Sequence, residues 1–495
     1  MELVSLLVFA VVFLIVYLWL RPSDQRLPPC PVSPLPIVGH VFHIDQDPRP
    51  QFKAWRKHCG DIYSLNLAGN PVIVLNGYDL MKEVLVKKAD ACSDRPKFYI
   101  DEVNGLSNQG LIYSSGAIWK EQRSVSLSIL RAFGMGKNLL AIKIQEEVAG
   151  LINYLSSLKG KPSDIRIMVN ISTCNIICSV LIGHRFEHED TKFQELMYKL
   201  GTLVTEQQTV SLINFYFWVR HIPGDFFKAK KLAANMKSVM TLLSKFIKEK
   251  RRHIEDASDV FNLIDAYTVE RNKKTQAGIS TTLNDQNLLK NMIDLFEAGT
   301  ETTSTTIYWC ILYLINYPDV QEKIYQEIIH KIGTDRAPTI QDKSQLVYLN
   351  AVITETQRLA SIVPLSVTHL CSEELTVSGY TLPKGALILP NLDSVLHDKA
   401  TWGEDAMKFR PERFIDNSGK LSIPEQFIPF GIGRRVCLGE SLAKMELFLF
   451  LSTMIQKFQF LPPDPNAVPP TTYENGLVLA PKAYEVRAVD RKRRL

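Results

Sequence analysis

One cysteine, Cys437, stands in a setting suited to holding a metal ion. It lies among glycines in the stretch Phe430–Glu440, directly ahead of the apolar run Ser441–Phe460. That run is predicted to be a buried helix, which places Cys437 just before a helix N-terminus. The positive end of a helix dipole favours a thiolate, the metal-binding form of cysteine. An isolated cysteine is more often a buried structural thiol, so the surrounding residues must decide.

A second stretch with chemical potential, Ala298–Thr306, lies inside a helix predicted from about Leu283 to Asn316. Glycine and β-branched residues are poor helix formers, and threonine hydroxyls can bond to carbonyls four residues earlier. We expect a groove beside Gly299, with Glu301 and Thr302 available for proton transfer. Taken alone, threonines satisfied by their own backbone are the simpler interpretation.

The pattern Phe-x-x-Gly-x-Arg-x-Cys-x-Gly resembles the haem-binding loop of the cytochrome P450 family. The matching residues are Phe430, Gly433, Arg435, Cys437 and Gly439. The stretch from Ala298 is similar to the family's Ala-Gly-x-Glu-Thr-Thr motif. The resemblance implies haem b with the Cys437 thiolate as axial ligand, which favours O–O cleavage. It also implies that Thr302 and Glu301 are catalytic residues that deliver protons during oxygen activation.

The same resemblance implies how the two carboxylates of the haem are held. A buried carboxylate without a partner is costly, so distant parts of the chain must supply cations or donors. Trp119 and Arg123 lie one helical turn apart and resemble the family's donors to these groups. The full set of expected cofactor-binding residues is Cys437, Arg95, Trp119, Arg123, His369, Arg435, Phe430, Gly431 and Gly439.

A charged triad is predicted to be structural. Glu355 and Arg358 share a helical face, and their apolar neighbours favour partial burial. The Glu-x-x-Arg motif and the later Pro-Glu-Arg-Phe motif resemble those of the family, which makes Arg413 the expected third member. We assign the triad to folding and to support of the haem loop.

Apolar residues in three places are predicted to line a pocket for a lipophilic substrate. They are Phe296, Ala298, Ile362, Val363, Leu365, Leu477 and Val478. The aromatic and lysine-rich stretch Asn214–Lys231 suits either a membrane interface or ordinary core packing.

The N-terminus carries an apolar run, Leu3–Leu20, that is near the minimum length for a membrane span. Arg21 and Arg26 follow it, which favours a signal anchor over a cleaved signal peptide and puts the remainder on the cytoplasmic side. The predicted organisation is an anchor at 1–20, a proline-rich hinge at 21–39 and one haem-thiolate monooxygenase domain at 40–495. The resemblance implies the endoplasmic reticulum membrane.

Length and composition fit one large body. The 495 residues suggest about three domains by length alone, but no linker divides them. A short hairpin is predicted around Tyr63–Val74, helical periodicity dominates from about Tyr78 to Leu359, and an exposed loop is expected at Glu270–Thr282. The predicted fold class is mainly α with small β-sheets, which fits the cytochrome P450 fold. A net charge of +5 is too small to indicate nucleic-acid binding. Eight scattered cysteines without a CxxC pair favour a reducing compartment.

The implied activity is membrane-bound monooxygenation of fatty acids, steroids or xenobiotics. No flavin or nicotinamide motif is present, so electrons are expected from an NADPH-dependent flavoprotein reductase, with cytochrome b5 as a second candidate partner. A basic patch of Arg434, Lys444 and Lys120 is predicted to dock an acidic partner. Two alternatives stay open: a haem-thiolate isomerase or dehydratase, and a non-catalytic haem-binding membrane protein.

Overall fold

The computed structural model describes residues 25–134, 138–187, 190–205, 213–215, 222, 224–251 and 262–491, with residues 4–6, 9 and 13. Most of the predicted anchor at 1–20, the start of the hinge and part of the aromatic stretch after Asn214 lie outside these residues. Among the residues described, no helix is both long and apolar enough to cross a membrane.

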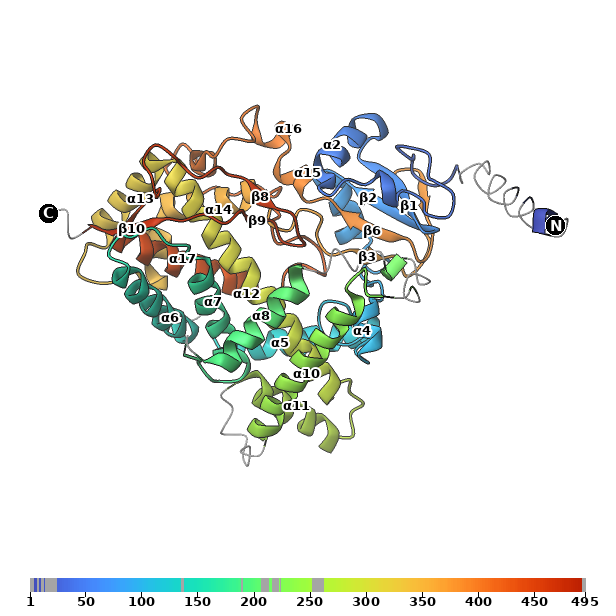
Figure 1. Cartoon of the computed structure of the whole chain (residues 1–495), viewed down its shortest axis with the longest axis horizontal. Coiled ribbons are helices and arrows are strands. Elements are labelled where there is room, and N and C mark those ends of the chain that lie inside the picture. The colour runs from blue at the N-terminus through green and yellow to red at the C-terminus, as the bar shows by residue number, and fades with distance from the viewer. Residues whose placement is uncertain are drawn as a thin grey trace.

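The longest described helix, α12 (Asp285–Asn316), runs through the helical part of the molecule (Figure 1). The Asn284 side chain caps its N-terminus by accepting a hydrogen bond from the Asn287 N–H. Against it pack α7 (Arg166–Leu181), α14 (Val347–Ala360) and α17 (Glu440–Lys457). The approach of α7 is close, since a Cβ on Gly299 would lie 2.5 Å from a methyl carbon of Ile177.

The other helices surround this core. In chain order they are α2 (Pro48–Cys59), α3 (Tyr78–Lys82), α4 (Tyr99–Val103), α5 (Gly116–Ala132), α6 (Asn138–Ser157), α8 (Thr191–Thr205), α10 (Ala229–Arg251), α11 (Leu263–Gln276), α13 (Pro318–Lys331), α15 (Asp393–Leu396) and α16 (Lys399–Trp402). Short 3₁₀ or π turns are η1 (Val41–His43), η2 (Glu83–Lys87), η4 (Ile340–Gln345) and η5 (Pro411–Phe414).

The sheets are small, and those that contain β7, β9 and β10 pack against helices of the core. The largest has the order β1-β2-β6-β3 and lies with α2 at the end of the molecule nearest the N-terminus (Figure 1). Its strands are β1 (Ile62–Leu67), β2 (Asn70–Leu75), β6 (Leu387–Pro390) and β3 (His369–Leu370). Two-stranded sheets join β4 (Leu375–Val377) to β5 (Tyr380–Leu382), β7 (Phe458–Leu461) to β10 (Arg487–Asp490), and β8 (Tyr473–Glu474) to β9 (Ala480–Pro481). The mainly helical prediction and the hairpin of β1 and β2 are confirmed.

Two predicted boundaries are wrong. The expected loop at 270–282 is helical as far as Gln276, because α11 is capped by Asn262 and buries Tyr267. The expected helix over 441–460 ends at Lys457, where the chain becomes strand β7. Phe458 and Phe460 are buried while Gln459 between them is only half-buried, which is the two-residue period of a strand.

Candidate functional site

The Cys437 loop is closed by its own backbone. The Cys437 N–H donates to the Phe430 carbonyl at 3.0 Å, and Gly439 is the N-cap residue of α17. Gly431 and Gly433 have positive φ angles of 74° and 80°, a conformation that favours glycine. A side chain at Gly433 would collide with the Leu85 carbonyl, so glycine also lets the loop pack closely on η2.

The Cys437 residue is exposed, yet the protein around its sulfur is the largest influence on the pKa of its thiol. Burial raises the pKa of the thiol, while the N–H groups of Gly439 and Glu440 and the charge of Arg123 lower it. The start of α17 therefore stabilises the thiolate as predicted, but burial has the larger effect and raises the pKa of the thiol. A metal cation bound to the sulfur would reverse this balance, because a coordinated thiol loses its proton.

Three arginines and one tryptophan meet beside the loop. The Arg435 guanidinium lies 3.9 Å from the centroid of the Trp119 ring, and that of Arg123 lies 6.0 Å from it. Burial and the nearby charge of Arg95 lower the pKa of Arg435 to about 8. Burial also lowers the pKa of Arg95 to about 10. We call Arg95, Trp119, Arg123 and Arg435 the cation cluster.

The cation cluster lacks a bound anion among the residues described. Arg95 donates to the carbonyls of Val367 (2.6 Å) and Thr368 (2.8 Å), and Arg435 donates to that of Ser93 (2.8 Å). Neither guanidinium has a carboxylate within 4 Å in the described part of the chain. The buried indole N–H of Trp119 has no acceptor there. The arginine charges without a carboxylate partner and the free Trp119 N–H fit a ligand that carries carboxylates, as the expected haem does.

His369 lies next to the cluster, but its ring has one nitrogen already engaged. Its Nδ1 lies 2.7 Å from the Cys92 carbonyl, which accepts only, so Nδ1 carries the proton. Burial, followed by the charge of Arg95, lowers the pKa of His369 well below its ordinary value. The neutral ring therefore offers Nε2 as an acceptor, and it donates to a carboxylate only when protonated.

The motif on α12 has one exposed residue. Ala298 is exposed in the middle of a largely buried helix. The Thr302 hydroxyl donates to the Ala298 carbonyl at 2.7 Å, so it is satisfied by its own helix. Phe296, expected in the substrate pocket, is fully buried and shows no open surface.

The Glu301 carboxylate turns toward α7. It lies 3.8 Å from Arg166 and accepts from Asn170 at 3.5 Å. Arg166 in turn lies 3.9 Å from Glu474, and side-chain exposure rises along this series from 15% to 27% to 55%. The series leads from the helix motif toward solvent. Arg166 was missed in the sequence, because no local pattern links it to a motif 135 positions later.

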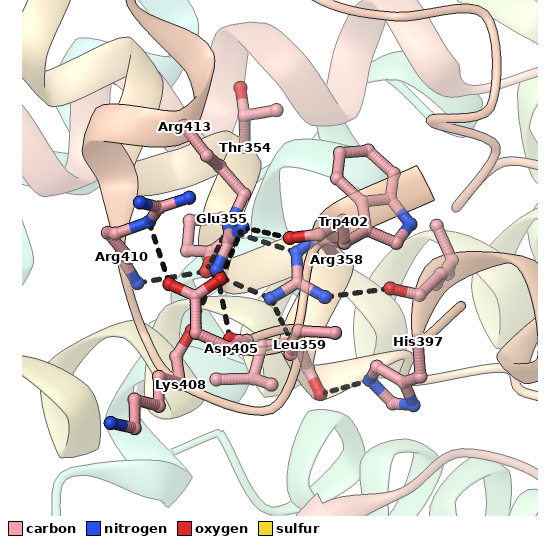
Figure 2. A network of polar contacts seen from close by, with 12 residues as sticks. Thr354, Glu355, Arg358, Leu359, His397, Trp402, Asp405, Lys408, Arg410 and Arg413 are labelled. Carbon is pink, nitrogen blue, oxygen red and sulfur yellow. Dashed lines mark hydrogen bonds and ion pairs between the residues drawn. The ribbon is translucent and has the colours of Figure 1, made fainter. Parts of the chain in front are cut away.

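The predicted triad is joined as expected, and Figure 2 shows Glu355 between the two arginines. Arg358 bonds both carboxylate oxygens of Glu355, at 2.7 and 2.9 Å, and Arg413 bonds one of them at 3.0 Å. The backbone N–H of Arg410 adds a fourth donor at 2.9 Å. Glu355 and Arg358 are fully buried. The triad thereby ties α14 to the segment that contains η5.

A cavity of about 800 Å³ lies between the β1-β2-β6-β3 sheet and the segment before α5. Arg95 of the cation cluster forms part of its wall, as do Asp94, Phe98, Phe215 and Leu370. Of the predicted substrate-pocket residues, Leu477 lines it, whereas Ile362, Val363, Leu365 and Val478 are half-buried outside its wall.

The predicted basic patch is partly neutralised. Arg434 pairs with Asp90 through two bonds, one of them 2.8 Å, and Lys444 pairs with Glu440 at 2.6 Å. Lys120 is exposed and has no ion pair among the residues described. Lys343, which the sequence did not single out, is close enough to Lys444 for its pKa to be lowered by burial and by that charge.

A buried acid on α17 also escaped sequence analysis. Glu446 is 1% exposed, and burial raises the pKa of its carboxyl to about 8, offset in part by a hydrogen bond with Thr303 of α12. Glu446 stands inside an apolar run of the sequence, and none of its sequence neighbours indicates that it connects α17 to α12.

Comparisons with known proteins bear on the same region. The family model for Cytochrome P450 matches residues 28–488. The chain is similar to cytochrome P450 2D9 of Mus musculus, with 37% identity over 94% of this chain and 93% of that protein. It is 36% identical to cytochrome P450 2D6 of Homo sapiens over 99% of both chains. It is also 36% identical to cytochrome P450 2J2 of Homo sapiens, over 98% of this chain and 96% of that protein.

Proposed function

The chain belongs to the cytochrome P450 family, with microsomal family 2 members among its relatives, and on that premise we propose that it oxidises lipophilic substrates at a membrane. It is a monooxygenase, and its family implies haem with a cysteine thiolate ligand. The proposed reactions are hydroxylation or epoxidation of fatty acids, steroids or xenobiotics. The observation that carries the proposal is the cation cluster beside the Cys437 loop: its arginine charges have no carboxylate partner among the described residues, and its Trp119 N–H has no acceptor there.

Each part of the haem has residues suited to it. Cys437 supplies the sulfur ligand, and Phe430, Gly431 and Gly439 shape the loop that presents it. The cation cluster would hold the two carboxylates, with the Trp119 N–H as a neutral donor. Held there, haem would supply the oxygen activation needed to place one oxygen atom in a C–H or C=C bond of the substrate.

Residues of α12 and of the elements packed against it are placed to supply protons. The proton on Thr302 Oγ1 is donated to the Ala298 carbonyl. During turnover the hydroxyl would turn away from that carbonyl, donate its proton to another acceptor and then take up a replacement proton. Glu301 lies at the inner end of a polar series with Arg166 and Glu474, whose exposure rises toward solvent, so it is placed to take up protons from solvent while Arg166 stays charged and orients its carboxylate. This arrangement supports reductive oxygen chemistry over the reductase-independent isomerase or dehydratase alternative, which requires no proton delivery.

Electrons are proposed to come from an NADPH-dependent flavoprotein reductase, with cytochrome b5 as a second donor. Lys120, Lys343 and Lys444 are the basic side chains that support docking of an acidic partner on the Cys437 side. We place the enzyme in the endoplasmic reticulum membrane through residues 1–20, with its body in the cytoplasm.

The proposal is tested by reconstituting the full-length protein with the reductase, NADPH and a panel of lipophilic substrates under isotopically labelled dioxygen. We expect product that carries one labelled oxygen atom, and no product when the reductase is left out. Product formed without reductase, or with oxygen from water, would favour the isomerase or dehydratase alternative. A folded protein that holds haem but turns over no substrate would favour a non-catalytic role.

A further inference from the structure

Two cysteines that are far apart in the sequence lie on neighbouring segments: Cys92 at the end of a turn and Cys371 directly after strand β3. The Leu370 N–H donates to the Asp94 carbonyl at 2.8 Å, which makes an antiparallel bridge. On the other side, the N–H that follows Cys371 donates to the carbonyl that precedes Cys92, at 2.9 Å. Between these two bonds Cys92 and Ser93 lie opposite Cys371, as in a β-bulge. Opposed residues on antiparallel segments have Cα atoms about 4.5–5.5 Å apart and disulfides span about 4.4–6.8 Å, so closing one here requires little movement of the backbone.

The two side chains belong to the same buried apolar cluster, and each thiol affects the ionisation of the other. Cys92 is 0% and Cys371 1% exposed, so neither is accessible to large molecules. The neighbouring Cys371 thiol and the charge of Lys88 lower the pKa of Cys92, whereas Cys92 and burial raise the pKa of Cys371. The pair therefore has one sulfur suited to attack and a second thiol beside it.

We propose that Cys92 and Cys371 form a redox site that closes to a disulfide with hydrogen peroxide as the oxidant. The Cys92 thiolate attacks one peroxide oxygen and breaks the O–O bond, which gives a sulfenic acid and, with one proton, water. The Cys371 sulfur then attacks the sulfenic sulfur, and the departing hydroxyl takes the thiol proton as a second water. In total, two thiols lose two electrons and two protons, and one peroxide becomes two waters.

The pair lies directly behind the wall of a cavity large enough for a small oxidant. Asp94, Leu370 and Gly385 line the cavity of about 800 Å³, and Asp94 and Leu370 also make the bridge beside the pair. The source of peroxide rests on the proposed function, because oxygen that is reduced without substrate oxidation leaves as peroxide. Peroxide added from outside tests the site without that assumption.

Closure of the disulfide would act on the cation cluster through the backbone. The Cys92 carbonyl accepts from His369, and the next carbonyl, that of Ser93, accepts from Arg435. Drawing the two sulfurs into covalent distance shifts both carbonyls and the groups they orient. We expect the oxidised protein to lose haem about tenfold faster, the effect of one weakened charge-assisted hydrogen bond.

The experiment uses the full-length, haem-loaded protein in detergent, treated with hydrogen peroxide or with the thiol oxidant diamide. After alkylation and digestion without reductant, we expect one cross-linked peptide pair that contains Cys92 and Cys371 and disappears with dithiothreitol. Cys371→Ser should abolish the cross-link. The matched variant Cys30→Ser, which removes an exposed thiol, should retain it. The rate of haem transfer to an apo-globin is the second readout.

Separately alkylated Cys92 and Cys371 after both oxidants, in protein that keeps its haem spectrum, would overturn the proposal. So would over-oxidation of Cys92 to a sulfinic acid without a cross-link. A cross-link that forms with added peroxide but never during turnover with reductase would support the redox site. It would also refute the claim that the enzyme itself produces the oxidant.

Discussion

Replacing Glu355 by glutamine is a sharp test of the buried triad. Glu355 accepts four hydrogen bonds: two from Arg358, one from Arg413 and one from the backbone of Arg410. Glutamine keeps the shape and one acceptor oxygen. It removes the negative charge that balances two buried guanidiniums, whose side chains are 0% and 4% exposed.

The expected cost of Glu355→Gln follows from that burial. Removing one partner from a buried ion pair costs about 3–5 kcal/mol, because the remaining charge is left uncompensated. The amide NH₂ also faces a guanidinium N–H in place of one accepted bond. Since proteins are stable by only about 5–15 kcal/mol, a loss of this size should be plain in urea unfolding followed by tryptophan fluorescence. Trp402 lies 5.2 Å from the Arg358 guanidinium and reports on the triad itself.

The matched control is Glu404→Gln, which makes the same chemical change in the surface pair Lys399–Glu404. These side chains are 57% and 87% exposed, so the loss should be below about 1 kcal/mol. If Glu355→Gln and Glu404→Gln unfold at the same urea concentration, the triad does not balance buried charge and our assignment of its role is refuted.

Three further predictions concern protons and docking. Glu301→Gln should lower the rate of product formation by about 10²-fold and raise peroxide release while substrate binding is unchanged; normal yield of product per NADPH would exclude Glu301 from proton supply. Because folded Glu446 holds its proton to about pH 8 and the unfolded group ionises near 4.5, its contribution makes stability fall as pH rises between these values, by about 1.4 kcal/mol per pH unit. Glu446→Gln should remove that part of the slope in urea unfolding across this range, and an unchanged slope would contradict a neutral buried acid. Charge reversal at Lys120 and Lys444 should raise the reductase concentration needed for half-maximal electron transfer at low salt and have little effect at high salt; an unaltered value at low salt would remove these lysines from the docking surface.

Contiguous motifs made the position of two candidate stretches predictable. The residues around Cys437 and those from Ala298 to Thr303 each form one short motif, and the structure has Cys437 just before α17 and the second motif within α12. The triad was also predictable, because its two halves each form a short motif. Its carboxylate and Arg413 nevertheless come from segments 58 positions apart.

Contacts between single residues on distant segments have no motif in the sequence that would predict them. Arg166 meets Glu301 only because α7 packs closely on α12 at Gly299. The buried ion pair of Lys290 with Asp101 (2.9 Å) likewise depends on how α4 is placed on α12. The ends of α11 and α17 were misjudged because caps and strand pairing, which are tertiary features, set them.

The most direct test of the account is the optical difference spectrum of the reduced, carbon-monoxide-bound protein, measured for wild type beside Cys437→His. We expect a strongly red-shifted band in the wild type that is lost in the variant while haem stays bound, because thiolate ligation by Cys437 produces it. A folded, haem-loaded wild type without that band, or a variant that keeps it, would contradict Cys437 as the ligand and with it the proposed mechanism.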